Sequence, residues 1–343
     1  LMRGRFESWR SLPYYTGQIE RPRKCFSFLR APAHTGGFGS SPISRPVNGH
    51  HLETNACQSG SPAPMSTKTI AASAAPVAQM SDTSWLFWTL QRAFGTCTMI
   101  VYVVLFGWLD SAEVEVLLFQ PLTWVLIILQ GNRHAILGMT LGYHRYFSHR
   151  AFKARRWFEG LLSYSCAASN QGGMGWWAAN HRHHHAHCDT REDPHSPVAR
   201  SRLYAWLGWP YDPRNARRRI RLRYPETRWL DRWCFLVPWM EWGLVWAFSG
   251  SRAFSTVVVL LPAFLSPFGT LWFNMMAHGG EPDGKGCTSR RYRVPSAVVL
   301  GESEHRDHHE YPRRARRPGP DIPYRLVLAP MARLGAVWDL RVR

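Results

Sequence analysis

The feature that most constrains this chain is a dense run of histidines between Asn180 and His195, with the sequence NHRHHHAHCDTREDPH. The rest of the chain is largely apolar or arginine-rich, so such a density of imidazole requires an explanation. His181, His184 and His185 follow an H-x-x-H-H pattern. Residues three and four apart lie on the same face of a helix, so these three rings can converge on a metal ion.

Further histidines stand in three other motifs: His305, His308 and His309 in GESEHRDHHEYP, His144 and His149 in GYHRYFSHR, and His278 in FNMMAHGG. The H-x-x-H-H pattern thus occurs twice in the chain. A structural zinc site needs only four ligands and usually includes cysteine, so nine histidines predict two metal ions. Neutral imidazole binds iron, zinc, copper and nickel, and the spacing does not choose among them.

The overall composition favours a membrane protein. Aromatic residues make up 13% of the 343 residues, and 17 of them are tryptophans, which suits a chain with membrane interfaces. The net charge of +19 would also suit nucleic acid, but no nucleic-acid-binding motif accompanies it, and a surface facing anionic lipid explains it equally well. The seven cysteines are scattered without a C-x-x-C motif, so we expect them to be reduced, without disulfide bonds or zinc.

The first part of the chain, residues 1–83, is rich in Ser, Pro, Gly and Arg and poor in acidic residues. We expect a disordered leader or targeting segment, followed by one domain over 84–343. A translated leader with the start at Met65 or Met80 and an organelle transit peptide are both open for this segment.

Four apolar runs follow: 94–109, 116–130, 233–250 and 253–277. They are either core helices of a soluble protein or membrane spans, and the distribution of charge favours spans. The connector after the first run is acidic, whereas arginines crowd at 217–223 and 313–317. The positive-inside rule therefore places these basic segments and both termini on the cytosolic or stromal side. Two membrane hairpins result, and all nine histidines then lie on one side of the membrane.

Taken together, HRYFSH, HRHHH, NMMAH and HRDHH resemble the histidine boxes of the membrane-bound fatty acid desaturases, most closely the acyl-CoA delta-9 (stearoyl-CoA) type. DPH at 193–195 and YAWLGW at 204–209 also resemble that family, and the likeness extends from about residue 84 to the C-terminus. The resemblance implies an all-α integral membrane protein: a four-helix transmembrane bundle with a cytosolic helical cap that carries the histidine boxes.

The same resemblance implies the chemistry. It assigns metal binding to His144, His149, His181, His184, His185, His278, His305, His308 and His309, with Asn274 holding a metal through water. It implies an oxidoreductase that uses two iron ions (Fe2+), dioxygen and two electrons to insert a cis double bond, at delta-9, into a saturated acyl chain during unsaturated fatty acid biosynthesis.

The implied partners are a fatty acyl substrate, with acyl-CoA as the first choice and acyl-lipid or acyl carrier protein as alternatives, and membrane lipid. The electron donor would be cytochrome b5 in the endoplasmic reticulum membrane or ferredoxin in a plastid membrane. No nucleic acid is implied.

His134, His183, His187 and His195 match no ligand position of the boxes, although His195 could hold a ligand-bearing loop. Ser303, Glu304 and Arg306 around the third box and Trp206 depart from the common family pattern, which weakens any transfer of substrate details. Two other functions are open. A membrane hydroxylase or ketolase of lipids would leave oxygen in its product, and a metal transporter would carry histidines inside its spans.

Overall fold

The computed structural model describes residues 82–93, 97–216, 219–294 and 299–342. The predicted leader therefore lies outside the described residues except for its last two positions, and so do the starts considered at Met65 and Met80. The first residues of the predicted run 94–109 and part of the arginine segment 217–223 also fall outside.

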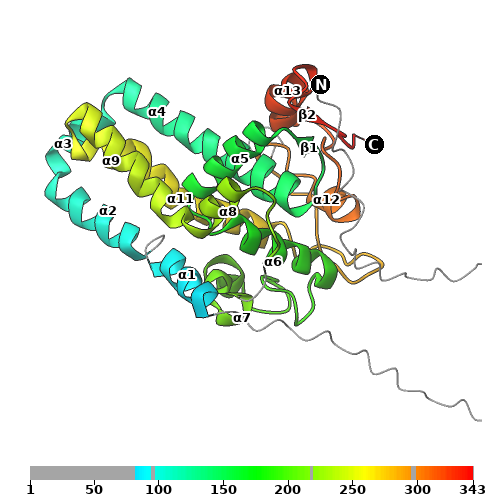
Figure 1. Cartoon of the computed structure of the whole chain (residues 1–343). Helices are drawn as coiled ribbons and strands as arrows, with labels where there is room; N and C mark the ends of the chain where they lie inside the picture. The colour runs from blue at the N-terminus through cyan, green and yellow to red at the C-terminus, as the bar shows by residue number, and fades with distance from the viewer. Residues whose placement is uncertain (1–81, 94–96, 217–218, 295–298, 343) are drawn as a thin grey trace, which may run out of the picture. The chain divides into compact units, whose positions relative to one another are not determined.

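The described part of the chain is mostly helical, which confirms the all-α prediction. The longer α-helices are α1 (Asp82–Arg92), α2 (Thr98–Leu109), α3 (Ser111–Leu118), α4 (Pro121–Asn132), α5 (Arg156–Ala168), α6 (Met174–His187), α8 (Pro225–Arg232), α9 (Val237–Ser249) and α11 (Leu261–Met276) (Figure 1). The shorter ones are α7 (Pro213–Ala216), α10 (Arg252–Ser255), α12 (His305–Glu310) and α13 (Ala329–Arg333). The π-helices are η2 (Arg133–Ser148), η3 (Tyr204–Gly208), η6 (Thr256–Leu260) and η7 (Tyr324–Leu328), and the 3-10 helices are η4 (Trp209–Tyr211) and η5 (Cys234–Leu236). Strands β1 (Lys153–Ala154) and β2 (Val337–Trp338) form an antiparallel pair in which Ala154 faces Val337.

The first histidine box lies at the end of a long helix. Pro121 occupies the first turn of α4, where its missing N–H costs nothing, and α4 continues without a break into η2. At about 1.5 Å per residue the helix from Pro121 to Ser148 is about 40 Å long. His144 is thus carried on the last turns of the helix that begins in the second predicted apolar run, and α3, which contains the start of that run, is bent from it by 89°.

One continuous helix among the described residues has the length and composition to cross a membrane, namely Arg252–Met276 with 25 residues. The bent pair α3 and α4–η2 is a second candidate if both parts belong to one span. Helices α2 and α9, in the first and third predicted runs, have 12 and 13 residues. The helical class is therefore established, and the four-span arrangement is not.

Two ion pairs neutralise charges near the apolar helices. Glu241 in α9 lies 2.6 Å from Arg133 at the start of η2 and also accepts a hydrogen bond from Gln130. Asp110, between α2 and α3, lies 2.6 Å from Arg252, the first residue of α10. The acidic turn between α2 and α3 therefore contacts the turn between α9 and α10.

Helix α6 carries the second histidine box, and its start is fixed by close packing. The N–H of Gly175 donates to Asp231 Oδ1 at 2.7 Å, which satisfies one of the free donors of the first turn. A Cβ atom on Gly173 would lie 2.6 Å from the same carboxylate oxygen, so only glycine permits this approach. Trp176 and Trp177 follow directly and belong to the main apolar core.

Candidate metal centre

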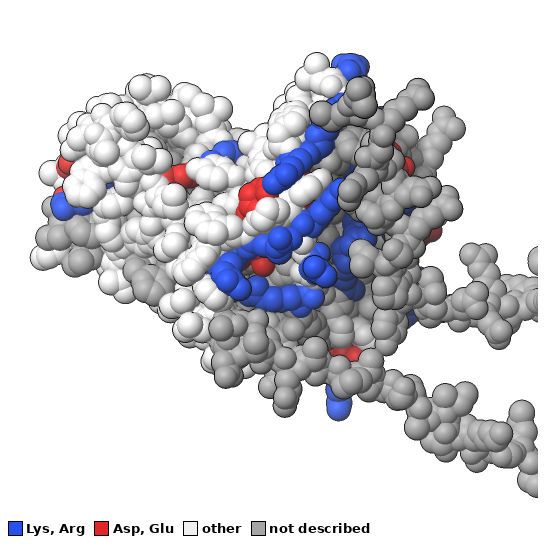
Figure 2. Space-filling view, in the orientation of Figure 1, with Lys and Arg blue, Asp and Glu red and all other residues white. Residues whose placement is uncertain are grey.

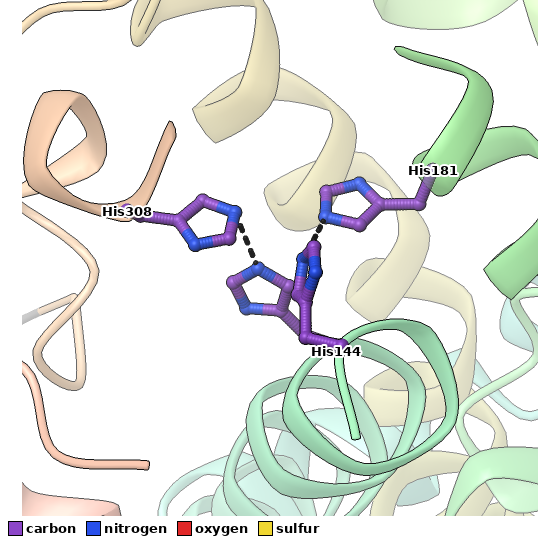
Figure 3. A group of neighbouring side chains, drawn as sticks. His144, His181 and His308 are labelled. Carbon is purple, nitrogen blue, oxygen red and sulfur yellow. Dashed lines mark hydrogen bonds between the residues drawn. The ribbon is translucent and has the colours of Figure 1, made fainter. Parts of the chain in front are cut away.

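Five of the predicted histidines form cluster 1: His144, His149, His181, His185 and His308. They come from η2 and the residue after it, from α6 and from α12, and Figure 3 shows the labelled members pointing toward one another from these elements. The Nε2 atoms of His144 and His308 are 2.9 Å apart, as are those of His181 and His149. His185 Nε2 lies 2.8 Å from that of His308.

The other four form cluster 2: His184, His278, His305 and His309. Nε2 of His278 lies 3.1 Å from Nε2 of His305, and Nε2 of His309 lies 3.2 Å from that of His305 and 3.3 Å from that of His184. The rings of His185 and His309 stack at 4.2 Å between centroids, so the two clusters are direct neighbours. All nine histidines are thus brought together in two groups.

The spacing of the nitrogen atoms suits metal coordination. Two nitrogens each about 2.1 Å from one ion lie about 3 to 3.4 Å apart for right-angled or tetrahedral bonds. The Nε2 separations in both clusters are close to this range.

Two aspartates fix the tautomers of two histidines in cluster 2. His184 Nδ1 lies 2.8 Å from Asp193 Oδ2, and His278 Nδ1 lies 3.2 Å from Asp189 Oδ2. A carboxylate only accepts when ionised, so these rings carry their proton on Nδ1 and offer a free lone pair at Nε2.

Burial favours the neutral form of several rings in the two clusters. It lowers the pKa of His181, His185, His305, His308 and His309 well below the ordinary value, and neighbouring positive groups add to the effect. A neutral imidazole is the form that binds a metal ion. The donor set and its spacing therefore fit two ions bound side by side, and so do the tautomers of His184 and His278.

The carboxylates behind cluster 2 are held ionised. Burial alone would raise the pKa of Asp193, but its contacts with His184 and His195 outweigh burial and leave the pKa below its ordinary value. For Asp189, hydrogen bonds from His278, Ser196 and Thr288 likewise outweigh burial and lower the pKa. Each aspartate can therefore orient a histidine of cluster 2 while remaining negative.

A buried network of two arginines and two carboxylates stands behind cluster 1. Arg145 lies 3.0 Å from Glu302 and 2.7 Å from Asp321, and Glu302 lies 3.5 Å from Nδ1 of His144. Arg317 donates to Nδ1 of His308 at 2.7 Å. A guanidinium has no acceptor, so Nδ1 of His308 accepts in this contact, unlike Nδ1 of His184.

The prediction that the cysteines are unpaired is wrong for one pair. Cys188, after α6, and Cys287, after α11, form a disulfide with 5.2 Å between their Cα atoms. Cys287 Sγ lies 3.4 Å from Nδ1 of His309, and Cys188 Sγ lies 3.9 Å from Nδ1 of His278. The pair is 99 residues apart in sequence, so a search for closely spaced motifs could not find it.

The remaining candidates take other places. Asn274 is half-buried on α11, one turn before His278, and its amide makes no hydrogen bond to another described residue. His195 stacks on His184 at 4.1 Å, and His183 and His187 form with Glu192 a partly exposed group. His134 is buried beside Arg133.

A pocket lies on the far side of aromatic residues that contact His181 of cluster 1 and His195. Its lining is mainly aromatic and aliphatic, and it contains about 470 Å³ of empty space, including its open mouth. Trp177 lines it and stacks on His181 at 4.8 Å, while Trp209 lines it and lies 5.1 Å from His195. One aromatic layer therefore separates this pocket from the histidines.

Comparison with known proteins identifies the family. A model of the fatty acid desaturase family matches residues 119–324, which is more than half of the chain. The chain belongs to the fatty acid desaturase family. This confirms the resemblance drawn from the histidine motifs, and the family is membrane-associated and generally di-iron dependent.

Several curated relatives are similar at moderate identity. A probable acyl-CoA desaturase of Schizosaccharomyces pombe is 29% identical over 244 residues, covering 66% of this chain and 50% of the relative. Delta-9 acyl-lipid desaturase 2 of Arabidopsis thaliana is 31% identical, covering 53% and 62%. The sn-2 palmitoyl-lipid 9-desaturase of Nostoc sp. is 31% identical, covering 52% and 67%. The chain thus spans about half to two thirds of the length of these relatives.

Proposed function

We propose that the protein is a fatty acyl desaturase that inserts a cis double bond into a saturated acyl chain. The observation that carries the proposal is the arrangement of nine buried or half-buried histidines in two adjacent clusters, within a chain of the desaturase family. The reaction is balanced as one –CH2–CH2– unit, dioxygen, two electrons and two protons giving one –CH=CH– unit and two water molecules.

In this proposal cluster 1 and cluster 2 each hold one iron ion, and Asn274 contributes through water. Bound iron supplies the oxidising power, together with dioxygen, because no side-chain acid or base removes hydrogen from an unactivated methylene group. The protein's own residues do the rest. Asp189 and Asp193 hold their histidines in one tautomer, and burial keeps water from the site.

The apolar pocket beside Trp177 suits the acyl chain. Leu207, Pro267, Phe268 and Leu271 offer a surface without charge along which methylene groups can pack. Trp177 separates the pocket from His181 by a single ring. Holding the chain at this wall would place one pair of carbons near the clusters, which is the positioning that such a reaction requires.

We further propose the two-hairpin membrane arrangement, with 84–343 as the catalytic domain. The Asp110–Arg252 pair joins the two turns at one end, whereas the histidines lie at the other ends of α4–η2 and α11. Large apolar side chains are exposed along the helices, and Phe248 on α9 is 89% exposed. Figure 2 shows little charge over α2, α4 and α9, and Lys and Arg gathered around α5 and α8.

A membrane explains this surface. The exposed apolar side chains would face the lipid tails, and the arginines would face the lipid headgroups on the cytosolic side. The endoplasmic reticulum membrane, or a plastid membrane, would house the protein, with cytochrome b5 or ferredoxin as electron donor. An N-glycosylation sequence inserted between Asp110 and Glu115 should be modified in the endoplasmic reticulum. Modification of a sequence inserted near Arg221 instead would contradict the arrangement.

Expression in a desaturase-deficient yeast tests the reaction. Gas chromatography with mass spectrometry of total fatty acids should show a new cis-monoene with its double bond at delta-9. If hydroxylated or keto products predominate, the protein is a hydroxylase or ketolase and not a desaturase. The variant His308→Ala provides the inactive control.

A further inference from the structure

A buried cation that forms no ion pair with any described residue lines the proposed acyl pocket. Arg92, the last residue of α1, lines the pocket and is 9% exposed. Its guanidinium lies over the ring of Trp176, 4.1 Å from the ring centroid. Among the described residues, no acceptor lies within hydrogen-bonding distance of its Nε or Nη2.

The surroundings keep this guanidinium in place. The neighbouring Gln91 donates to the carbonyl of Asp231 at 3.0 Å and accepts from the N–H of Gly173 at 3.2 Å, which fixes the end of α1 against the start of α6. Gly172 has a φ of +90°, and a Cβ atom there would lie 2.8 Å from Nη2 of Arg92. The absence of a side chain at Gly172 therefore makes room for the guanidinium.

Burial without a partner is unfavourable for a charged group, and it lowers the pKa of Arg92 to about 10. A neighbouring cation, Arg219, lowers the pKa of Arg92 further. Trp209 lines the same pocket, and its indole N–H is also buried without an acceptor. Two unsatisfied donor groups thus line a pocket whose remaining lining is mainly aromatic and aliphatic, with Asn170, Gln171 and Tyr211 as its other polar residues.

We propose that Arg92 and Trp209 bind the head of the acyl substrate, and that they accept its carboxyl-derived oxygen atoms as hydrogen-bond partners. This inference rests on the proposed function, since it assigns the polar end of the ligand whose methylene chain fills the pocket. The arrangement sets the direction of the chain: the head lies at Arg92 and Trp176, and the tail extends past Trp177 beside His181.

Arg92 lies outside the residues 119–324 that the family model matches. An oxygen acceptor of this kind occurs in a free carboxylate, in a thioester and in a glycerolipid ester, and the pocket geometry is common to all three.

The test compares ligands that share one chain and differ in the head. Purified full-length protein in lipid nanodiscs would be titrated with stearate, stearoyl-CoA, methyl stearate and octadecane, and binding measured by calorimetry or by displacement of a spin-labelled stearate. Arg92→Met should weaken at least one ligand that carries a head by about tenfold to 100-fold, because a charged hydrogen bond is lost. Octadecane, which has no head, should bind within about twofold of the unmodified protein.

The pattern of loss identifies the source of the oxygen. A loss for stearate alone assigns a free carboxylate, a loss for stearoyl-CoA alone assigns the CoA thioester, and a loss that includes methyl stearate assigns a neutral carbonyl. Trp209→Phe keeps the ring and removes the N–H, so it should weaken the same ligands by about threefold to tenfold. Equal weakening of octadecane, or unchanged binding of every ligand, would overturn the proposal.

Arg232→Met is the matched control, because Arg232 makes a similar contact over Phe87 at 4.7 Å but does not line the pocket. Thermal unfolding and metal content check that each variant is folded. Where Arg92→Met does not fold, Arg92→Lys keeps the charge and loses the planar fork, and the same ligands should be weakened by about threefold to tenfold.

Failure of this proposal differs from failure of the proposed reaction. Head-dependent binding without any alkene in yeast would leave the headgroup site standing and remove the desaturase function. Alkene formation with unchanged binding by Arg92→Met would do the reverse.

Discussion

Cluster 1 and cluster 2 use the same side chain but are supported differently. In cluster 1, the histidines are carried by helices or by the residue directly after one, and the group behind them is the charge network of Arg145, Glu302, Asp321 and Arg317. In cluster 2, His184 and His278 are oriented by single aspartates from the loop after α6. A disulfide between two loops lies directly behind His278 and His309.

This difference indicates that cluster 2 depends more on its loops. Asp189, Asp193, Cys188 and Cys287 all lie outside the helices. Glu302, Arg317 and Asp321 behind cluster 1 also lie outside helices, but Arg145 of that network is carried by η2. Loops open more readily than helices, so a metal ion in cluster 2 should be lost first when the protein is perturbed. Cluster 1 should resist the same perturbations.

Loss of a ligand should have the largest effect and should not distinguish the clusters. His308→Ala in cluster 1 and His305→Ala in cluster 2 should each reduce product formation by more than about 100-fold. This loss is larger than the one expected when a residue that only orients a ligand is replaced. Monoene formation per milligram of membrane protein measures this. His183→Ala, on α6 but outside both clusters, is the control and should stay near the unmodified activity; full activity of either ligand variant would contradict the shared centre.

Loss of an orienting carboxylate should have an intermediate effect that separates the clusters. Asp193→Asn should lower product formation by about 10-fold to 100-fold, since the amide no longer fixes the tautomer of His184. Metal should be lost from cluster 2 alone.

Glu302→Gln should affect cluster 1 instead, through His144. Metal content and product formation, measured on the same samples, check both variants. Glu226→Gln, in an exposed pair with Arg156, should change neither quantity. Equal metal loss from both clusters in Asp193→Asn would remove the distinction between them.

Loss of the disulfide should have the smallest effect on activity. The bond closes a loop of 99 residues, and removal of such a cross-link costs about 2–5 kcal/mol of stability. Cys188→Ser, or treatment with a reductant, should therefore lower the thermal midpoint and speed metal release from cluster 2 several-fold. Cys97→Ser is the control, because Cys97 is exposed and unpaired. Peptide mapping without reductant should recover the cross-linked pair, and free thiols at both positions would contradict it.

The sequence predicts the histidines well and their supports poorly. The repeated H-x-x-H-H pattern places all three rings of a box near one helix face, and both copies and the first box meet in the structure. It could not sort them, because His184 and His185 are adjacent in sequence yet belong to different clusters. That division depends on how α6 packs, because it brings His185 to His308 and His184 to His278 and His309.

The supporting residues carry no sequence signal of their own. Asp189 and Asp193 stand among other acidic residues after the second box, and only the fold brings them to His278 and His184. Arg317 lies in an arginine-rich stretch and was assigned to a cytosolic surface, but it is buried against His308. Arg92 was likewise indistinguishable from other arginines, since burial without a partner is a property of the packed structure.

The sequence predicts the helical class of the fold correctly, but it does not predict the bounds of every helix. The apolar runs at 116–130 and 253–277 correspond to helices, but the first is divided near Pro121, and its second part continues as far as the first histidine box. Hydropathy marks where apolar residues lie, and it does not mark where a polar helix continues beyond them.

The number of iron ions per chain tests the central claim most directly. Full-length protein, purified from iron-supplemented cells and analysed by inductively coupled plasma mass spectrometry, should carry close to two irons per chain and little zinc. His184→Ala should lower this toward one iron, since cluster 1 does not include His184. One zinc ion per chain with no iron would contradict the account.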